Sequence, residues 1–215
     1  MLFVWCKVSF DEKRSHGSAV CETVYFFVEF VCVFPWKCVS LNNQNRGKIM
    51  DGILRKLPIG IQTFEKLREG DYLYVDKTAL VWRIASTETP YFLSRPRRFG
   101  KSLLLSTFEA YFEGKKELFE GLVIANMEKE WKTYPVFHLD LNAEKYDSPQ
   151  ALVEILSRQL TQWELKYGKG EDEETLSGRF AGVIRRASEQ ADRGVVVLVD
   201  EYDKPLLQAL DDGAL

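Results

Sequence analysis

Two kinds of hydrophobic pattern alternate along the chain from residue 50 onward. Apolar residues that recur every three to four positions predict helices at 62–69, 77–86, 100–114, 148–167 and 173–191. Short apolar runs predict strands at 71–75, from Tyr91, at 135–141 and at 195–199. Thr63 and Asp76 are placed to cap the first two helices, and Gly194 is expected to end the last. This alternation predicts an α/β fold with a mostly parallel sheet.

The first 49 residues differ in character from the rest. The segment Cys21–Val39 is rich in aromatic and β-branched residues, but Glu29 interrupts it and Pro35 ends it. Its uninterrupted apolar runs are far shorter than the ~20 residues that a membrane helix needs. We consider a β-rich extension, a poor membrane anchor, or residues translated from upstream of the natural start. The change in composition just before Met50 favours the third interpretation, so we expect a boundary between residues 49 and 50.

Composition and charge narrow the classes of function. The net charge of −3 and the pI of about 5.6 provide no general basic field to attract nucleic acid. The four cysteines all lie within the first 38 residues and lack Cys-x-x-Cys spacing, which argues against a zinc site. The absence of cysteine from the rest of the sequence fits a reducing cytoplasm, where we expect the protein. His138 stands alone in an apolar run, which favours a core or edge histidine over a metal ligand.

The stretch from Tyr91 to Phe112 carries the first candidate for chemistry. It is a short apolar run, then a basic loop, then a helix that begins at Gly100-Lys101-Ser102, as in the phosphate-binding loop of P-loop NTPases. Gly100 would let the backbone approach a phosphate, Lys101 would bind the β- and γ-phosphates, and Ser102 would ligate Mg²⁺. The usual pattern G-x-x-x-x-G-K-[ST] is not complete, because Arg95 replaces the first glycine.

The second candidate is the strand at 195–199, which ends in Asp200 and Glu201. Carboxylates at the carboxyl end of a buried parallel strand lie where open α/β sheets bind ligands. In this Walker B arrangement Asp200 would hold Mg²⁺ and Glu201 would act as general base on the attacking water. A strand-terminal Asp also serves as an ordinary helix cap, so the pairing with Gly-Lys-Ser about a hundred residues earlier makes the interpretation more specific.

Four motifs together resemble the predicted AAA-ATPase-like proteins common in gut Bacteroidetes and other anaerobes. The motifs are Leu57-Pro58-Ile59-Gly60-Ile61, Tyr74-Val75-Asp76-Lys77-Thr78, Arg95-Pro96-Arg97-Arg98-Phe99-Gly100-Lys101-Ser102 and Asp200-Glu201-Tyr202-Asp203-Lys204-Pro205. The resemblance implies that Arg-Arg-Phe-Gly-Lys-Ser is this family's own phosphate loop. It also implies a P-loop NTPase core with three αβα layers, often followed by a PD-(D/E)xK nuclease-like domain. The second motif lies where such folds often bind the base of the nucleotide, although plain packing explains it equally well.

The resemblance further implies five core strands in the order 5-1-4-3-2, of which this chain supplies the first three. The fourth would lie between the phosphate-loop strand and the Asp200-Glu201 strand, so we expect those strand edges to be unpaired. The expected organisation is an N-terminal extension at 1–49 and an incomplete AAA-ATPase-like domain at 50–215. We therefore expect this chain to bind ATP weakly and to hydrolyse it negligibly.

The leading functional hypothesis is Mg²⁺-dependent ATP hydrolysis that is coupled to a partner or to a downstream nuclease-like domain. The alternatives are a nucleotide-binding switch with little turnover and an inactive fragment. ATP and Mg²⁺ are the expected ligands, with no direct nucleic-acid or membrane binding by this chain. The predicted site comprises catalytic residues (Lys101, Glu201), nucleotide-binding residues (Arg97, Arg98, Phe99, Gly100, Lys101, Ser102, Leu103) and metal ligands (Ser102, Asp200).

Overall fold

The structure, a computed structural model, describes residues 4–8, 55–87, 89–93, 99–142 and 149–205. These residues form a mixed fold of helices and strands. In chain order the elements are β1 (Val4–Val8), α2 (Phe64–Glu69), α3 (Thr78–Ala85), β2 (Tyr91–Phe92), α4 (Lys101–Phe112), the 3₁₀ helix η1 (Lys116–Phe119), α5 (Ile124–Met127), β3 (Val136–Asp140), α6 (Pro149–Tyr167), α7 (Leu176–Ala191) and β4 (Val195–Asp200). The α/β class predicted from the sequence is confirmed.

The described strands form one sheet in the order β2-β1-β4-β3. β3 pairs with β4 in parallel, whereas β1 is antiparallel to both β2 and β4. β2, β4 and β3 therefore run in the same direction, and β1 runs against them. The carboxyl ends of β2, β4 and β3 consequently lie at one edge of the sheet, where the chain continues into the predicted site.

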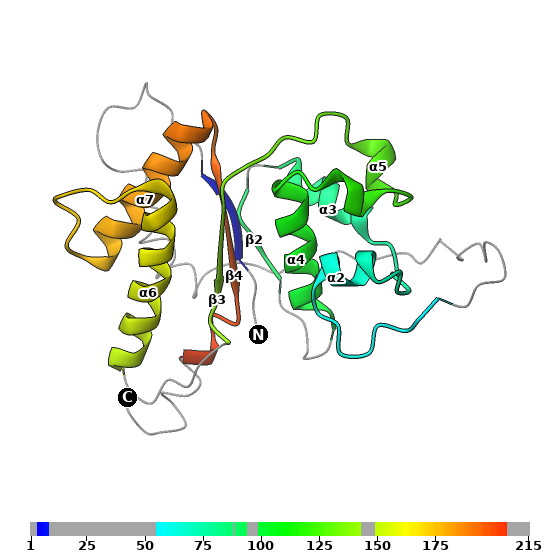
Figure 1. Ribbon diagram of the computed structural model, residues 1–215, viewed down its shortest axis with the longest axis horizontal. Coiled ribbons are helices and arrows are strands. Elements are labelled where there is room, and N and C mark those ends of the chain that lie inside the picture. The colour runs from blue at the N-terminus through cyan, green and yellow to red at the C-terminus, as the bar shows by residue number, and fades with distance from the viewer. Residues whose placement is uncertain (1–3, 9–54, 88, 94–98, 143–148, 206–215) are drawn as a thin grey trace.

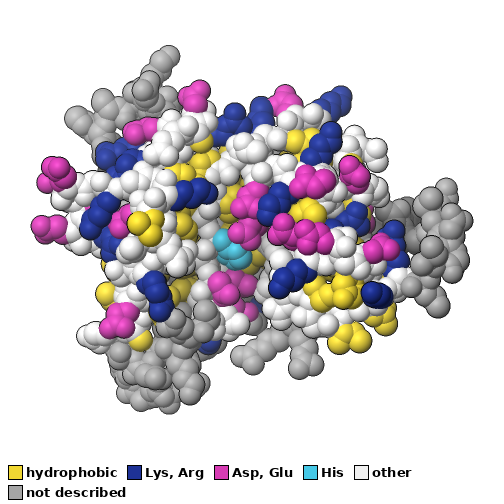
Figure 2. All heavy atoms as spheres, viewed as in Figure 1, with side chains coloured by type: hydrophobic (Ala, Val, Ile, Leu, Met, Phe, Trp, Pro, Cys, Tyr) yellow, Lys and Arg dark blue, Asp and Glu magenta, His cyan; other side chains and the backbone are white. Residues whose placement is uncertain are grey.

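Helices cover both faces of the sheet (Figure 1). On one face Val196 and Leu198 of β4 pack into a core that includes Phe108 and Phe112 of α4. On the other face Val195 packs against α6 and α7. Alternate residues of β4 thus contact opposite helical layers, which explains why its apolar run is continuous. Seen as in Figure 2, acidic side chains gather with some basic ones in the middle of the surface between the two helical layers.

The position of β1 was not foreseen. All five of its residues pair with β4, from Val4 opposite Val199 to Val8 opposite Val195, and its first two residues pair with β2. The expectation of unpaired edges between the phosphate-loop strand and the Asp200-Glu201 strand is therefore wrong for the described sheet. The reason is that a segment from the first 49 residues supplies the missing backbone hydrogen bonds.

Several local predictions need correction. Residues 71–75 form no strand, because the segment makes only an isolated bridge between Lys56 and Tyr72. Thr63 lies at the start of α2, but its side chain makes no capping hydrogen bond. The last long helix, α7, begins after Thr175, whose side chain accepts a hydrogen bond from Gly178 N. It ends at Ala191, as predicted, but its C-cap is Asp192, which adopts the left-handed conformation with φ 50°, and not Gly194. The predicted cap at Ser148 lies outside the described residues.

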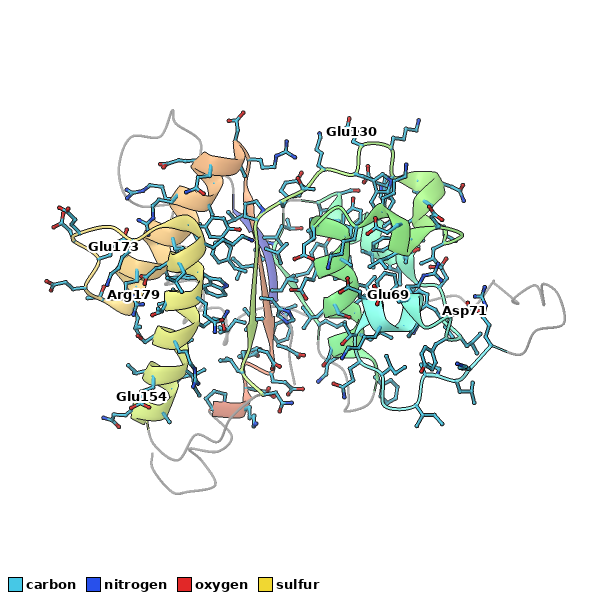
Figure 3. All side chains as sticks on the ribbon, in the orientation of Figure 1. Glu69, Asp71, Glu130, Glu154, Glu173 and Arg179 are labelled. Atoms are coloured by element: carbon cyan, nitrogen blue, oxygen red, sulfur yellow. The ribbon has the colours of Figure 1, made fainter. Side chains whose placement is uncertain are left out.

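Partly buried ion pairs join α6 to α7 and its preceding loop. The guanidinium of Arg179 on α7 donates to both carboxylate oxygens of Glu164 on α6, at 2.7 and 2.8 Å. Arg186 makes the same two-pronged contact with Glu173, at 2.6 and 2.9 Å. These hydrogen bonds lower the pKa of Glu164 and of Glu173 below the usual value. Figure 3 shows Arg179 and Glu173 on the α6–α7 side of the molecule.

Of the helices in the described part of the chain, none has the length and apolar character required to cross a bilayer.

Candidate functional site

The site begins at the first turn of α4. Gly100 immediately precedes this helix and has φ 73°, a left-handed conformation that favours glycine. The first hydrogen bond of the turn runs from Leu104 N to Gly100 O, at 3.0 Å. The amides of Lys101, Ser102 and Leu103 precede that bond, so they are the groups that a helix start offers to an anion. The sequence therefore predicted both the glycine and the helix start correctly.

Lys101 is unusually buried for a lysine. Its side chain is 4% exposed, and its Nζ lies 4.0 Å from Glu201 Oε1. Nζ has no hydrogen-bond partner among the described residues. A buried ammonium without a hydrogen bond is costly. A phosphate oxygen would satisfy it.

Asp200 and Glu201 lie beside that helix start, at the end of β4. Asp200 Oδ2 accepts a hydrogen bond of 2.8 Å from Ser102 Oγ. The other carboxylate oxygen, Oδ1, is buried and has no partner within the described part of the chain. Glu201 is 7% exposed and adopts φ 57°, a left-handed conformation that a glutamate seldom takes. Burial raises the pKa of the Glu201 carboxyl, and Lys101 opposes that rise in part.

These residues fit magnesium bound together with a polyphosphate. Mg²⁺ is usually held by one or two protein oxygens, and the remaining positions are taken by water and phosphate. Ser102 Oγ and Asp200 supply such oxygens, and Lys101 supplies a charge for the phosphates. Among the residues described, no group of three or more His, Cys, Asp or Glu side chains could hold a metal by itself.

The predicted site residues differ in how the structure places them. Lys101, Ser102, Asp200 and Glu201 come together although about a hundred positions separate the two pairs. Leu103 is half-buried on α4, and Phe99 is 62% exposed just before Gly100. Arg97 and Arg98 lie outside the described residues.

Comparison with known proteins places the sequence in a family. Residues 58–215 match the model of the AAA-ATPase-like family, described as predicted AAA-ATPase. The chain belongs to this family. The membership predicted from the four motifs is thereby confirmed, and it indicates an ATPase-like function.

A curated relative extends this comparison. The chain is 43% identical over 157 residues to an uncharacterized protein in the vnfD 5′ region of Azotobacter chroococcum mcd 1. The alignment covers 73% of this chain but 30% of the relative, so the chain spans less than a third of that protein's length. No solved structure matches the chain. β1 precedes the region that the family model matches.

Two further residues of the AAA-ATPase-like domain lie near this edge of the sheet. Asp140 was missed in the sequence, and Lys204 belonged to the fourth motif without an assigned role. Asp140 ends β3 and is the register partner of Asp200. Its signal was visible, because the strands VFHLD and VVVLVD both end in aspartate. Lys204 donates from Nζ to the carbonyl of Asn142, at 2.6 Å, and from its backbone N to Glu201 O, at 3.0 Å. Lys204 thus ties the loop after β3 to the turn that contains Glu201.

His138 lies on β3 and contacts the middle of α4. Its Nδ1 is 3.1 Å from Glu109 Oε2. Burial lowers the pKa of His138, but the hydrogen bond to Glu109 and the charges of Glu109, Asp140 and Asp200 outweigh it, so the pKa is raised overall. The predicted edge placement agrees, because β3 is the outer strand of the described sheet. The histidine is not fully satisfied, since its Nε2 is buried and has no hydrogen-bond partner among the described residues.

The motif at 74–78 has a structural role in the described fold. Asp76 Oδ1 accepts hydrogen bonds from Thr78 N and Oγ1, and Asp76 Oδ2 accepts one from Val123 N. Thr78 Oγ1 in turn accepts a hydrogen bond from Ile124 N. These contacts fasten the start of α3 to the start of α5. Packing thus accounts for the geometry of Asp76 and Thr78 within the fold, and base binding at this motif stays a prediction.

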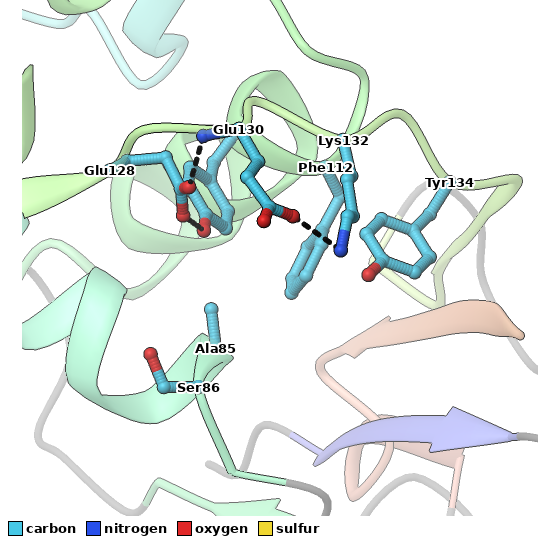
Figure 4. A pocket seen from close by; sticks show the side chains of 8 residues that line it. Ala85, Ser86, Phe112, Glu128, Glu130, Lys132 and Tyr134 are labelled. Atoms are coloured by element: carbon cyan, nitrogen blue, oxygen red, sulfur yellow. Dashed lines mark hydrogen bonds and ion pairs between the residues drawn. The ribbon is translucent and has the colours of Figure 1, made fainter.

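A polar pocket also exists at the other end of α4. Its lining includes Tyr111, Glu128, Glu130 and Lys132 (Figure 4). Tyr111 donates to Glu128, and Glu130 pairs with Lys132. At 1.5 Å per residue, Tyr111 lies roughly 15 Å along the helix from Lys101. The pocket is therefore separate from the residues that converge on α4's first turn.

Proposed function

We propose that this AAA-ATPase-like domain binds ATP with Mg²⁺ at the first turn of α4 and hydrolyses it. One observation carries the proposal: a buried lysine and a serine at a helix start face two buried carboxylates at the end of the neighbouring strand. Ser102 Oγ is 2.8 Å from Asp200 Oδ2, and Lys101 Nζ is 4.0 Å from Glu201 Oε1. Family membership supports the same conclusion.

Each residue has a distinct role in this proposal. The amides at the start of α4 and the ammonium of Lys101 bind phosphate oxygens, and Ser102 and Asp200 are the protein ligands for the metal. Bound Mg²⁺ would neutralise charge on the phosphates. Glu201 takes the proton from the attacking water, and its raised pKa suits a base that works near neutral pH. Arg97 and Arg98 precede this turn in sequence and would add positive charge near the phosphates.

A nucleotide-dependent switch with little turnover is the second candidate. It is favoured by the direct hydrogen bond between Ser102 and Asp200, because a metal ligated by both groups would have to replace that bond. Ligand binding would then change the contact between α4 and β4, which is the kind of local event that drives a switch. In either case we propose that the nucleotide state is passed to a partner or to additional domains, such as a nuclease-like domain, in longer members of the family.

The low affinity expected from the sequence remains a prediction. One of its reasons, the unpaired strand edges, does not hold in the described sheet, because β1 pairs with both β2 and β4. ATP binding is therefore best measured directly on the 215-residue chain, by calorimetry with and without Mg²⁺. Turnover is measured by phosphate release on the same preparation.

Three variants test the proposal. Lys101→Met should abolish binding, Ser102→Ala should remove the Mg²⁺ dependence of binding, and Glu201→Gln should retain bound ATP while turnover stops. Lys116→Met changes an exposed lysine just beyond the C-terminal end of α4 and serves as the control. ATP binding that is equal in Lys101→Met and Lys116→Met would disprove the proposed site. Binding with no turnover in the unchanged protein, and no effect of Glu201→Gln, would identify the switch instead, provided that a longer member of the family shows no turnover either.

A further inference from the structure

The first feature that the proposed function leaves unexplained is how β2 is attached to the sheet. β2 is the two-residue strand before the phosphate loop, and within the described residues it pairs with β1 alone. β4, which carries Asp200, pairs with β1 on one side and with β3 on the other. β1 is therefore the backbone link between the strand that enters the loop and the strand that ends in the acids.

The second feature is the direction of β1. It runs against three strands that share one direction, and long stretches of sequence separate it from both of its neighbours. Closing a longer loop adds little further entropic cost, so a distant segment can occupy such a position without a tight connection. An extended segment that adds itself to available strand edges is a recognised mode of peptide binding, in which main-chain hydrogen bonds supply the affinity.

We propose that the space between β2 and β4 is a strand-docking site, and that residues 4–8 of this chain are the docked strand that holds the phosphate loop in register with Asp200 and Glu201. The sequence of the strand, VWCKV, is mostly apolar and β-branched or aromatic, which suits an extended segment inside a sheet. The effect of this strand on ATP binding rests on the proposed function, whereas the docking of the strand is independent of that function.

A cross-linking experiment tests the docking without any ligand. Cys6 is the register partner of Val197, and paired Cα atoms in antiparallel strands lie about 4.5–5.5 Å apart, within the range that a disulfide spans. We would replace the other cysteines (Cys21, Cys32, Cys38) with serine and compare Val197→Cys with Val196→Cys under mild oxidation. Val196 is the partner of Lys7 and faces the opposite side of the sheet, so it is a matched control.

The expected result is a link between Cys6 and the thiol at position 197 in most of the protein, and at least tenfold less link at position 196. Mass spectrometry of the cleaved protein identifies the linked peptides. Mixing isotopically labelled and unlabelled chains distinguishes a link within one chain from a link between two. Equal linkage at both positions, no linkage at 197, or linkage only between chains would overturn the proposal.

A second variant tests the consequence for the site. Alternate residues of an antiparallel strand direct their N–H groups to opposite neighbours. A double variant with Cys6→Pro and Lys7→Pro therefore removes one N–H group that donates towards β4, whichever of the two residues carries it. The control carries Cys6→Ala and Lys7→Ala, which keep both donors. Val196 N donates to Pro135 O on the β3 side, so the alternate amides of Val195, Val197 and Val199 face β1. Hydrogen exchange of these three amides should accelerate at least tenfold in the proline variant alone, and a synthetic peptide of residues 1–10 should restore protection.

The same proline variant should bind ATP at least tenfold more weakly than the alanine control. Unchanged exchange in the proline variant would refute the docked strand. Protection that depends on the strand, together with no ATP binding by any version of the protein, would support the docking and refute the proposed function, so the two failures can be told apart.

Discussion

Replacing Lys101 with methionine removes a buried ammonium and keeps an unbranched side chain of similar length. The structure predicts that this change abolishes nucleotide binding and leaves the stability of the free protein almost unaltered. Such a combination is unusual for a buried charged residue with an opposite charge nearby.

The expected change in stability on Lys101→Met follows from two opposing contributions. Attraction between charges 4.0 Å apart amounts to about 4 kcal/mol at an effective dielectric constant of about 20. Desolvation of the ammonium costs several kcal/mol, and no hydrogen bond among the described residues compensates for it. The two nearly cancel, and after the substitution Glu201 can take up a proton because its pKa is already raised. We expect a net change of less than about 2 kcal/mol, or within about 6 °C in Tm for a domain of this size.

Thermal unfolding followed by circular dichroism, with and without Mg·ATP, measures both halves of this prediction. At a nucleotide concentration a hundred times Kd, the free energy of unfolding of the unchanged protein should increase by about 2.7 kcal/mol, which corresponds to several degrees in Tm. Lys101→Met should show no such gain. A loss of more than about 3 kcal/mol without nucleotide would show that Lys101 is a structural cation, and the argument for a phosphate ligand would fail.

Three further predictions concern other groups of the domain. Arg179→Met should lower the free energy of unfolding in urea by about 3–5 kcal/mol, because it leaves the buried carboxylate of Glu164 without its partner. Arg185→Met on the same helix should lower it by less than about 0.5 kcal/mol, since the ion pair of Arg185 is exposed. Similar losses in the two variants would contradict the difference in burial. ATP turnover should rise with pH through an apparent pKa above the usual ~4.3 of glutamate, because burial raises the pKa of Glu201; a rise centred at the usual value would argue against Glu201 as the base. The pKa of His138 is raised in the folded state, so its charged form stabilises the fold below pH ~6.5, and this stability is lost as the pH rises through the folded-state pKa. Glu109→Gln should flatten this dependence of stability on pH. An unchanged profile would show that the contact between His138 and Glu109 does not raise the pKa.

The parts of the fold that the sequence predicted well depend on local pattern. The continuous apolar run of β4 and the periodic apolar face of α4 each specify one element, and the topology of a parallel sheet brings the end of one near the start of the other. Two short motifs were therefore sufficient to predict that Lys101, Ser102, Asp200 and Glu201 would meet.

The parts that the sequence did not predict depend on pairing between distant segments. Nothing in residues 4–8 specifies that their neighbours are β2 and β4, because an apolar pentapeptide fits many strand positions. The bidentate pair Arg179–Glu164 joins two helices and shows no spacing that a single helix would reveal. Residues 71–75 have the alternation of a strand, but Leu73 and Val75 are exposed, and within the described part of the chain no strand pairs along the segment.

The left-handed backbone at Glu201 has a consequence for how this position can vary. A residue with a side chain in that conformation costs on the order of 1 kcal/mol or more, and glycine would avoid the cost. Glu201→Gly should therefore relax the chain at the tip of β4 while it deletes the proposed base. The same change would leave the buried ammonium of Lys101 without the opposite charge 4.0 Å away. A screen for heat resistance would therefore favour glycine at 201 only together with an uncharged residue at 101, and a screen for ATP turnover would reject both changes.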